Sequence, residues 1–302
     1  MLLQKQVKSV LNKHKKRNFW YLNDYSVNPY ECCSCNCQYC YIRGSKYGEN
    51  MEDDLVVKSN ALEIPEKQLA ARAKKQQYRI VTVGSGTDAC IHHEERLRMT
   101  EGISKLLLKY RFPVFISTKC LLIKRDIALL KEIDKAAILP EDLQHKLKRG
   151  VILSVSISTL KEKISNMLEP GAAPPLQRLQ LQQQLKDEGF LVSVNAIPVL
   201  PFISDSEEEL EKMIAEAKSF HADYILTGSL TLFGNEFADS KILYYKFLER
   251  YNPALLSKYK PLYAQNFYAP YQYQRQLKEK ADKLCKKYTI RNSIGEKLCQ
   301  NN

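Results

Sequence analysis

The sequence has no long hydrophobic run, no internal repeat and no extended linker. No apolar stretch approaches the roughly 18 residues needed to span a membrane, and residues 1–20 lack the apolar segment of a secretory signal peptide. The missing repeat argues against a solenoid. With 302 residues, 44% of them hydrophobic, the chain has enough apolar material for a sizeable core. We therefore expect a folded cytoplasmic protein, whose cysteines are reduced, reactive or metal-bound rather than paired in disulfides.

Acidic residues are absent from residues 1–17, which contain six Lys and Arg. Residues 271–302 contain eight Lys and Arg against three acids. The residues between these ends contribute only +1 to the formal net charge of +12. Because Lys and Arg neutralise phosphates, the basic ends are candidates to bind nucleic acid. The alternative is that the ends are merely solvated.

Runs rich in β-branched residues alternate with helical patterns along the body of the chain. The predicted strands cover residues 55–58, 79–83, 114–117, 151–158, 191–197 and 224–227. Predicted helices lie between them, and Ser206 opens a capping box before Leu210. The alternation predicts six βα units with a parallel sheet, either a partial barrel or an open doubly wound sheet. In both, chemistry gathers at the carboxyl ends of the strands.

This alternation ends at about residue 252. A tyrosine-rich stretch follows, and then a basic helix with Leu277, Ala281, Leu284 and Tyr288 on one face, which we expect to dock on the barrel. Tyrosines near Lys258 and Lys260 either stack nucleic-acid bases or pack as a lid. We divide the chain into a basic N-terminal extension (1–22), a core (23–250) and a Tyr-rich, basic helical C-terminal extension (251–302).

Five of the nine cysteines fall between Cys32 and Cys40. Thiolates bind zinc or iron–sulfur clusters. Read as two CxxC pairs, the segment leaves one residue between the pairs, too few for an ordinary zinc site. Read as Cys33-x3-Cys37-x2-Cys40, three thiolates hold three irons of a [4Fe-4S] cube and leave the fourth iron open for a substrate or cofactor.

The remaining cysteines fit no spacing. Cys32 and Cys35 are then bystanders, unless Cys35 takes the fourth iron and blocks it. Cys120, Cys285 and Cys299 have no partner at a recognisable distance along the chain, and we assign them no function.

The CxxxCxxC motif, with Tyr39 before its last cysteine, resembles the signature of the radical S-adenosylmethionine (radical SAM) superfamily. Further blocks, in the same order over about residues 23–230, are similar to its spore photoproduct lyase-like branch. They are Asn28-Pro29-Tyr30, Cys40-Tyr41-Ile42-Arg43, Gly86-Thr87-Asp88 with Glu94, Ser117-Thr118-Lys119 with Lys124-Arg125-Asp126, Val155-Ser156-Ile157-Ser158, Glu169-Pro170-Gly171 with Pro174 and Arg178-Leu179, and Pro198-Val199-Leu200-Pro201 with Asp205. The resemblance implies an α/β fold, a partial (β/α)6 TIM-like barrel with a helical C-terminal extension.

The resemblance also implies radical chemistry. A reduced [4Fe-4S] cluster on Cys33, Cys37 and Cys40 would pass an electron to S-adenosylmethionine (SAM), which splits into methionine and a 5′-deoxyadenosyl radical that abstracts a hydrogen atom from the substrate. An electron donor such as flavodoxin or ferredoxin is implied. In the lyase the substrate is a thymine dimer of spore DNA.

Site residues follow position by position. The backbone of Tyr39 matches a position near adenine. The SAM amino group is expected after the strand at 79–83, at Ser85, Gly86, Thr87 and Asp88. Lys119 and Ser156, at the ends of the next two strands, match positions that contact SAM, where a lysine pairs with the carboxylate and a serine hydrogen-bonds.

One position departs from the lyase. Its hydrogen-donating cysteine lies three residues before the aspartate that we align with Asp88, where this chain has Ser85. A serine O–H bond is too strong to donate a hydrogen atom readily. Cys90 is a substitute, with Tyr39 and Tyr41 as relay candidates, unless Cys90 is simply buried. The departure argues against simple photoproduct repair.

Three hypotheses follow. The first is a lyase-like radical SAM enzyme acting on damaged or modified nucleic acid. The second is a radical SAM enzyme acting on a protein, peptide or small molecule. The third is a non-enzymatic iron–sulfur or redox-sensing module, in which the extra cysteines close the cluster.

Overall fold

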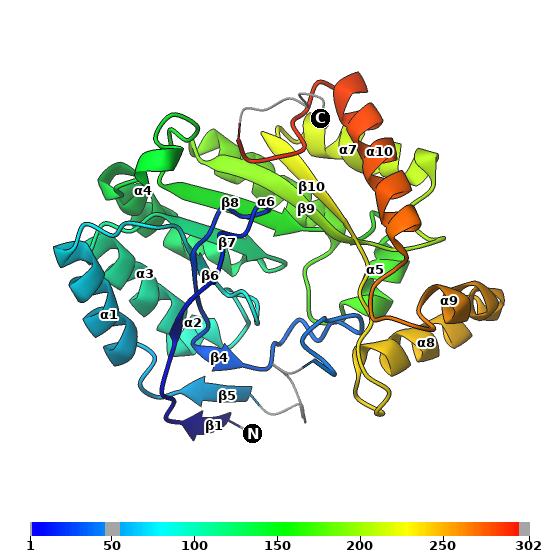
Figure 1. Cartoon of the computed structure of the whole chain (residues 1–302), viewed down its shortest axis with the longest axis horizontal. Helices are drawn as coiled ribbons and strands as arrows, with labels where there is room; N and C mark the ends of the chain where they lie inside the picture. Colours follow the sequence, from blue (N-terminus) through cyan, green and yellow to red (C-terminus); the bar gives the residue numbers. More distant parts are fainter. Residues whose placement is uncertain (1, 46–54, 296–302) are drawn as a thin grey trace.

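The computed structural model describes residues 2–45 and 55–295. Its main sheet has seven strands in the order β10-β9-β8-β7-β6-β3-β2 (Figure 1). Their bounds are β2 Leu11–Lys13, β3 Tyr25–Val27, β6 Val81–Val83, β7 Val114–Thr118, β8 Val151–Ser156, β9 Leu191–Val199 and β10 Tyr224–Ser229. Six of these strands run parallel and β2 is antiparallel to β3. The prediction of an α/β fold with a partial, unclosed barrel is confirmed.

One strand of the predicted six lies elsewhere. The segment at 55–58 does form a strand, β5 (Leu55–Lys58), but it joins β1 (Leu2–Lys5) and β4 (Tyr30–Glu31) in a separate small sheet. The sixth parallel strand is β3, which the sequence analysis missed because polar residues flank its three positions, whereas the equally short β6 continues a run of β-branched residues. Since β3 is followed closely by β4 and then Cys32, the cysteine segment begins at the carboxyl edge of the main sheet.

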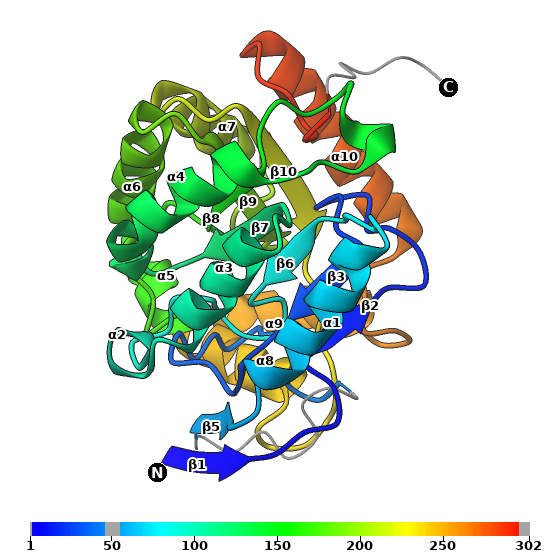
Figure 2. The ribbon, with the colours of Figure 1, turned by 90° about the vertical axis from the view of Figure 1, so that its left-hand side faces the viewer.

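The described chain has ten helices, most of which pack on the outer face of the main sheet or on one another. They are α1 Glu63–Lys74, α2 Glu94–Leu97, α3 Met99–Lys109, α4 Ile127–Ala136, α5 Glu162–Leu168, α6 Pro175–Asp187, α7 Glu207–Ser219, α8 Ser240–Tyr251, α9 Leu256–Leu262 and α10 Tyr271–Lys287. Short 3-10 turns occupy Leu121–Asp126, Glu141–Leu143 and Pro253–Leu255. Figure 2 shows α1, α3 and α4 as a layer over β6, β7 and β8. The N-cap predicted at Ser206 is confirmed, since its hydroxyl accepts a hydrogen bond from the Glu209 amide at 3.1 Å, while the Glu209 carboxylate pairs with Lys161.

The two faces of the parallel strands have different neighbours. Side chains alternate along a strand, and one set, such as Val114, Ile116 and Leu153, packs in the core shared with the helices. The other set faces the inside of the partial barrel. At the amino edge this inner set is apolar, with Phe115 and Ile152 packed in a cluster that the segment Trp20–Leu22 joins.

Towards the carboxyl edge the inner face becomes polar. Ser117 follows Phe115 on β7, Ser156 follows Ile152 on β8, and Asn195 follows Leu191, which packs against the same apolar cluster, on β9. The Ser154 and Ser193 hydroxyls are 2.9 Å apart across β8 and β9. The barrel is therefore filled at one end and lined with hydrogen-bonding groups at the other, where the cysteine segment lies.

The C-terminal helix docks as predicted. Leu277, Ala281 and Leu284 of α10 are buried, and the helix packs against α7 and β10. Residues 296–302, including Cys299, lie outside the described residues. None of the helices in the described chain is both long enough and apolar enough to span a membrane.

Candidate functional site

The segment Cys32–Cys40 is a compact loop at the carboxyl edge of the sheet. Cys32 and Asn36 adopt positive φ angles of 66° and 45°, and turns close through backbone bonds from Cys40 to Cys37 and from Arg43 to Cys40. The Asn36 side chain accepts a hydrogen bond from Arg43 at 2.6 Å. Asparagine tolerates the left-handed region better than most residues. We call residues 32–40 the cysteine loop.

The loop brings the three predicted cluster ligands together. The Cys33, Cys37 and Cys40 side chains are half-buried. Burial raises the pKa of both Cys37 and Cys40, and the charge of the nearby Cys33 thiolate raises each further. The Cys33 sulfur also accepts a hydrogen bond from the Asp88 amide at 3.3 Å. Three soft donors at one place suit an iron–sulfur cluster with one open iron.

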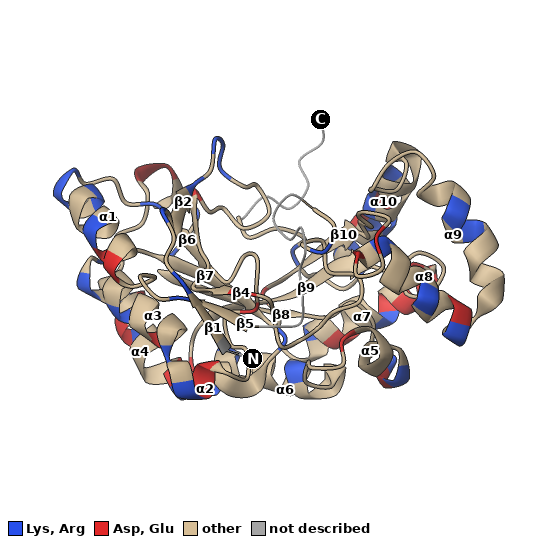
Figure 3. Ribbon diagram, turned by 90° about the horizontal axis from the view of Figure 1, so that it is seen from below, with Lys and Arg blue, Asp and Glu red and all other residues tan. Residues whose placement is uncertain are grey.

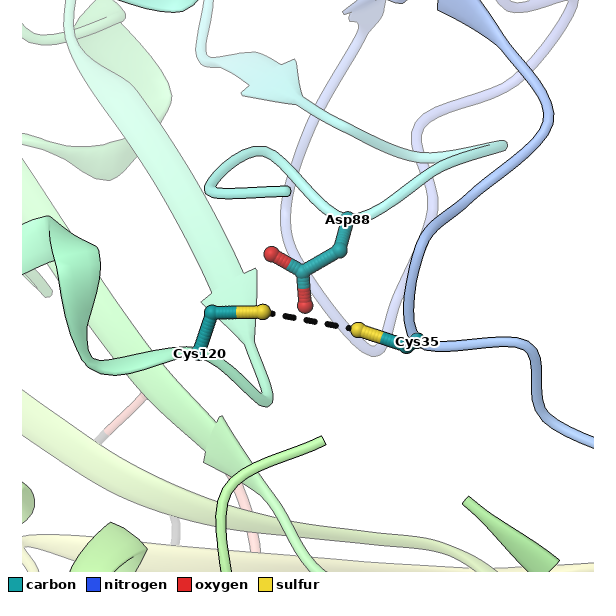
Figure 4. Close-up of side chains that lie close together, drawn as sticks. All are labelled: Cys35, Asp88 and Cys120. Carbon is teal, nitrogen blue, oxygen red and sulfur yellow. Dashed lines mark hydrogen bonds between the residues drawn. The ribbon is translucent and has the colours of Figure 1, made fainter. Parts of the chain in front are cut away.

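Cys35 lies on the buried side of the same loop. Its side chain is 1% exposed, and its sulfur is 3.4 Å from that of Cys120, just after β7 (Figure 4). Asp88 lies beside both, and the three ligand atoms are all within 4.8 Å of one another. Sequence spacing gave no sign of this group, because Cys35 and Cys120 are 85 residues apart.

Asp88 joins the loop after β6 to the end of β7. Its carboxylate accepts hydrogen bonds from the Cys90 amide (2.8 Å), the Thr118 hydroxyl (2.7 Å) and the Lys119 amide (2.7 Å). Its own amide bonds to Cys33. Asp88 therefore positions Lys119 and a cluster ligand through the backbone.

Ser85, Gly86 and Thr87 form the turn between β6 and Asp88. Asn28, which follows β3, donates to the Ser85 hydroxyl at 3.0 Å and accepts from the Gly86 amide at 2.6 Å. Tyr41 donates to the Ser85 carbonyl oxygen. The Asn28 contacts hold this turn beside the cysteine loop, at the place where the resemblance puts the SAM amino group.

Lys119 and Ser156 meet beside the cysteine loop. The Lys119 amine donates to the Ser156 hydroxyl at 2.6 Å and lies 3.9 Å from a Glu169 oxygen. Burial alone would lower the pKa of Lys119, but Glu169 and the Cys37 thiolate outweigh burial and raise it. Arg178 forms an ion pair with Glu169 at 2.5 Å. The half-buried Lys119 and the buried Arg178 share one carboxylate, so among these three side chains the positive charges outnumber the negative.

The segment between α5 and α6 clamps the cysteine loop. The Leu168 carbonyl accepts a hydrogen bond from the Gln38 amide, and the Gly171 amide donates to the Cys35 carbonyl. The Ala173 amide donates to the Lys119 carbonyl. Tyr39, on the loop, donates its hydroxyl to Glu169. Sequence reasoning placed residues 169–178 among the family-like blocks but gave them no role. In the sequence they show only an acid and an arginine nine residues apart, which does not predict that the two side chains are buried together.

Asn195, in the middle of β9, is a site residue that the sequence analysis missed. Its amide donates to the Tyr21 hydroxyl at 3.1 Å and to the Ser117 hydroxyl at 3.3 Å. It pairs across the sheet with Ser156. Burial raises the pKa of Tyr21, while the hydrogen bond from Asn195 and the positive charge of Lys119 each lower it by a smaller amount. Tyr21, Asn195 and Lys119 therefore lie close together.

The catalytic candidates lie in different surroundings. Tyr41 is 47% exposed beside Ser85. Cys90 is 2% exposed and packs in the core shared with the helices. The Tyr39 side chain is buried against Glu169 and Ser158. Among the three, only Tyr41 has an exposed side chain.

The residues present fit a cluster and a polar cofactor. Within residues 2–45 and 55–295, the Asn195 Oδ1 and Thr87 Oγ1 atoms are buried without a hydrogen-bond partner, and buried polar atoms ordinarily have one. The surplus positive charge at Lys119 and Arg178 suits a carboxylate. The three half-buried thiols supply soft ligands.

Comparisons with known proteins agree with this fit. The model of the radical SAM superfamily matches residues 27–214. An uncharacterized protein of Mycobacterium tuberculosis is 29% identical over 272 residues, covering 88% of this chain and 75% of that protein. An uncharacterized protein of Acidianus two-tailed virus is 30% identical over 140 residues, covering 44% of this chain and 42% of its own length.

Solved structures of spore photoproduct lyase are similar in fold. One mutant has a TM-score of 0.67 at 13% identity, covering 95% of this chain and 79% of that one. A mutant with bound AdoMet and dinucleoside spore photoproduct has a TM-score of 0.63 at the same identity and coverage. With its family match spanning more than half its length, the chain belongs to the radical SAM superfamily of enzymes, which use a [4Fe-4S] cluster and S-adenosylmethionine.

Proposed function

We propose that this enzyme binds its cluster through Cys33, Cys37 and Cys40, cleaves SAM reductively and acts on a damaged or modified base in nucleic acid. When bound, the cluster and SAM supply one-electron chemistry that removes a hydrogen atom from the substrate. The chain itself supplies binding, orientation and exclusion of water. An electron donor of the flavodoxin or ferredoxin class and a reducing, cytoplasmic setting belong to the proposal.

The charged cluster beside the cysteine loop supports SAM binding. In the described chain, Glu169 is the carboxylate that pairs with both Lys119 and Arg178, and the SAM carboxylate would supply a second. Lys119 and Ser156 both offer hydrogen bonds at the ends of adjacent strands. The unpartnered Thr87 and Asn195 oxygens are acceptors for the amino and ribose groups.

The observation that carries the substrate class is a gathering of exposed aromatic side chains. Seven aromatic residues are exposed in the described chain. Tyr41, Phe202 and Phe237 lie in segments that follow the carboxyl ends of strands. Phe267 and Tyr268 follow α9 but pair with Leu232 and Thr231, just after β10, and Tyr271 begins α10. Apart from Phe19 and Tyr41, the exposed rings are Phe202, Phe237, Phe267, Tyr268 and Tyr271. We call these five residues the aromatic rim. Exposed aromatic rings are costly to leave in water and are the usual platforms for stacked bases.

The aromatic rim adjoins the cysteine loop. The Ser240 hydroxyl, at the start of α8, donates to the Arg43 carbonyl at 3.3 Å and accepts from the Phe233 amide at 2.9 Å. The Phe233 ring stacks on Phe267 with centroids 4.2 Å apart. Contacts through Ser240 and Phe233 therefore connect Arg43, which lies three residues after the cysteine loop, to Phe267 of the aromatic rim.

Basic side chains accompany these rings. The Lys258 amine lies 5.4 Å above the Phe202 ring. Figure 3 shows acidic and basic residues mixed over the helices, whereas α9 has Lys258 and Lys260 without an acidic residue. Rings and lysines together suit a phosphate chain with unstacked bases.

The basic ends of the chain are less suited to deliver a substrate. On α10, Lys283 and Lys287 pair with Glu207 and Glu211 of α7 at 3.0 and 2.5 Å. The N-terminal lysines around residue 15 lie in the loop between β2 and β3, at the amino edge of the sheet and opposite the site. The aromatic rim is therefore our candidate nucleic-acid surface.

An anaerobic assay tests the proposal. The protein is loaded with iron and sulfide and given dithionite and SAM, with DNA, RNA or peptide present, and 5′-deoxyadenosine is measured. We expect about four irons per chain, product formation that a nucleic acid stimulates, and no product with Cys37→Ala. A fully loaded protein that forms no product would overturn the enzyme assignment.

A paired variant tests the substrate surface. We expect Phe267→Ala with Tyr268→Ala to weaken single-strand binding by about tenfold or more, since stacking contributes roughly 1–3 kcal/mol per base. Phe19→Ala, an exposed ring at the opposite edge, is the control. Stimulation by peptides alone, or equal loss in both variants, would refute nucleic acid as the substrate. Because Ser85 stands where the lyase has its hydrogen donor, we expect no simple photoproduct repair.

A further inference from the structure

Two buried thiols face each other beneath the cysteine loop. Cys35 and Cys120 are 1% and 3% exposed, and their sulfur atoms are 3.4 Å apart. Figure 4 shows the two side chains pointing towards each other from the loop and from the end of β7. A disulfide needs a sulfur–sulfur distance of about 2.05 Å. The gap is therefore little more than an ångström, within the reach of side-chain rotation.

The neighbours of this pair favour a thiol pair over a metal site. Asp88 is the third member of the group, but its carboxylate already accepts hydrogen bonds from Cys90, Thr118 and Lys119. A metal ion would have to displace donors that hold the strand ends in place. The two thiols need only each other.

The partner of Cys35 is set by the cluster motif. The Cys33 thiol also hydrogen-bonds with Cys35, but Cys33 belongs to the CxxxCxxC motif and is bound to iron in the loaded enzyme. Cys120 is then the sulfur that remains within reach of Cys35. The backbone of the loop is fixed there by the bond from the Gly171 amide to the Cys35 carbonyl at 3.2 Å.

We propose that Cys35 and Cys120 are a reversible redox-modification site that ties the cysteine loop to the end of β7. The oxidant is a low-molecular-weight disulfide. One thiolate attacks it, giving a mixed disulfide and one released thiol, and the second protein thiolate then displaces the other small thiol. Two S–H bonds and the small S–S bond break, the protein S–S bond forms, and both protons leave on the two small thiols. The protein sulfurs are oxidised and the small disulfide is reduced.

The proposed disulfide joins residues 85 positions apart in the sequence, so it strongly reduces the conformational entropy of the unfolded chain. It also fixes the loop against Lys119, the residue before Cys120, without using a cluster ligand. The inference is independent of the substrate proposed above, because it concerns only the cysteine loop and β7.

Peptide mapping of the intact enzyme tests this site. The iron-loaded protein is incubated without oxygen in 2-hydroxyethyl disulfide, the remaining thiols are alkylated under denaturing conditions, and the digest is analysed by mass spectrometry. Iron is measured in parallel. We expect a linked peptide joining Cys35 to Cys120, unchanged iron content, and complete reversal by dithiothreitol. Cys35→Ser and Cys120→Ser should lose the linked peptide, and Cys285→Ser, a buried cysteine of α10, should keep it.

Other results would overturn the proposal. One is alkylation of both Cys35 and Cys120 after the oxidant has modified other thiols. Another is a main disulfide from Cys35 to Cys33 or Cys37, with loss of iron. If the serine variants load iron poorly, the test is decided by the iron-loaded wild type and Cys285→Ser, both of which must give the Cys35–Cys120 peptide.

Discussion

Gly171 faces Ser34 so closely that a Cβ atom on the glycine would lie 1.8 Å from the Ser34 carbonyl oxygen. That separation is far shorter than a van der Waals contact, and the Ser34 carbonyl belongs to the backbone, so it cannot rotate away as a side chain could. The cysteine loop and the segment before α6 therefore touch where one of them has no side chain. Their approach depends on glycine for space, and it sets how the loop lies on the barrel.

Gly171→Ala should displace the cysteine loop. We expect a loss of roughly 1–3 kcal/mol in the free energy of unfolding, as for other overpacked sites, and a lower iron content after reconstitution. Urea unfolding and iron analysis measure the two effects. Gly295→Ala is the control, because nothing lies within 4 Å of a Cβ there. Normal iron loading by Gly171→Ala would contradict the role of this contact.

Glu169→Gln should destabilise the fold by about 3–5 kcal/mol, because it leaves Lys119 and Arg178 buried without their counter-charge. Burial alone would raise the pKa of Glu169, but Lys119 and Arg178 hold it below its usual value. A carboxyl group whose pKa is lower in the folded protein than in the unfolded chain stabilises the fold at pH values above its unfolded pKa. That stabilisation is lost as the pH falls through its folded pKa.

The difference in unfolding free energy between wild type and Glu169→Gln should therefore narrow as pH falls below about 4.5. Denaturant titrations at several pH values measure it. Glu162→Gln, which replaces an exposed acid on α5, should change neither the free energy of unfolding nor its dependence on pH. A gap that stays constant with pH would show that charge is not the source of the effect.

Lys119→Met should weaken SAM binding. A hydrogen bond to a charged group contributes about 1.5–3 kcal/mol, which corresponds to roughly a tenfold to hundredfold rise in Kd. Equilibrium dialysis of SAM against the iron-loaded protein measures this rise. Lys135→Met, an exposed lysine of α4, should bind SAM like the wild type. Equal affinities in both variants would remove Lys119 from the site.

Asp88→Asn should loosen the junction between β6, β7 and the cysteine loop. The asparagine side-chain NH2 group cannot accept the hydrogen bonds that the Asp88 carboxylate now accepts from Cys90, Thr118 and Lys119. We expect the free energy of unfolding to fall by about 1–3 kcal/mol. Urea unfolding of the variant against Asp187→Asn, an exposed position on α6, measures that cost. Iron content should also fall, since the Asp88 amide bonds to Cys33. Stability equal to that of the control would contradict the prediction.

Regular periodicity explains what was predictable. The strands at 114–117, 151–158, 191–197 and 224–227 were long enough to show their character, and β7 to β10 occupy nearly these bounds. The N-cap at Ser206 fixed the start of α7 because Ser206 and Glu209 act locally. In contrast, β3 has three residues, and only its pairing with β6 and β2 identifies it as a strand of the main sheet.

The site shows the same division. Cys33, Cys37 and Cys40 were recognisable because their spacing lies within eight residues of sequence. The contacts of Cys35 with Cys120, of Tyr39 with Glu169 and of Asn195 with Tyr21 span 85 to 174 residues. No local pattern encodes such distances.

The sequence alone determined the cluster motif, the βα alternation and the superfamily, because each depends on residues close together in the chain. The tertiary structure decided which side of the loop Cys35 occupies, which buried charges balance, and where aromatic rings and basic residues are exposed. These depend on how strand ends and loops meet across the sheet. Packing and burial there are set by neighbours that the chain brings together only when it folds.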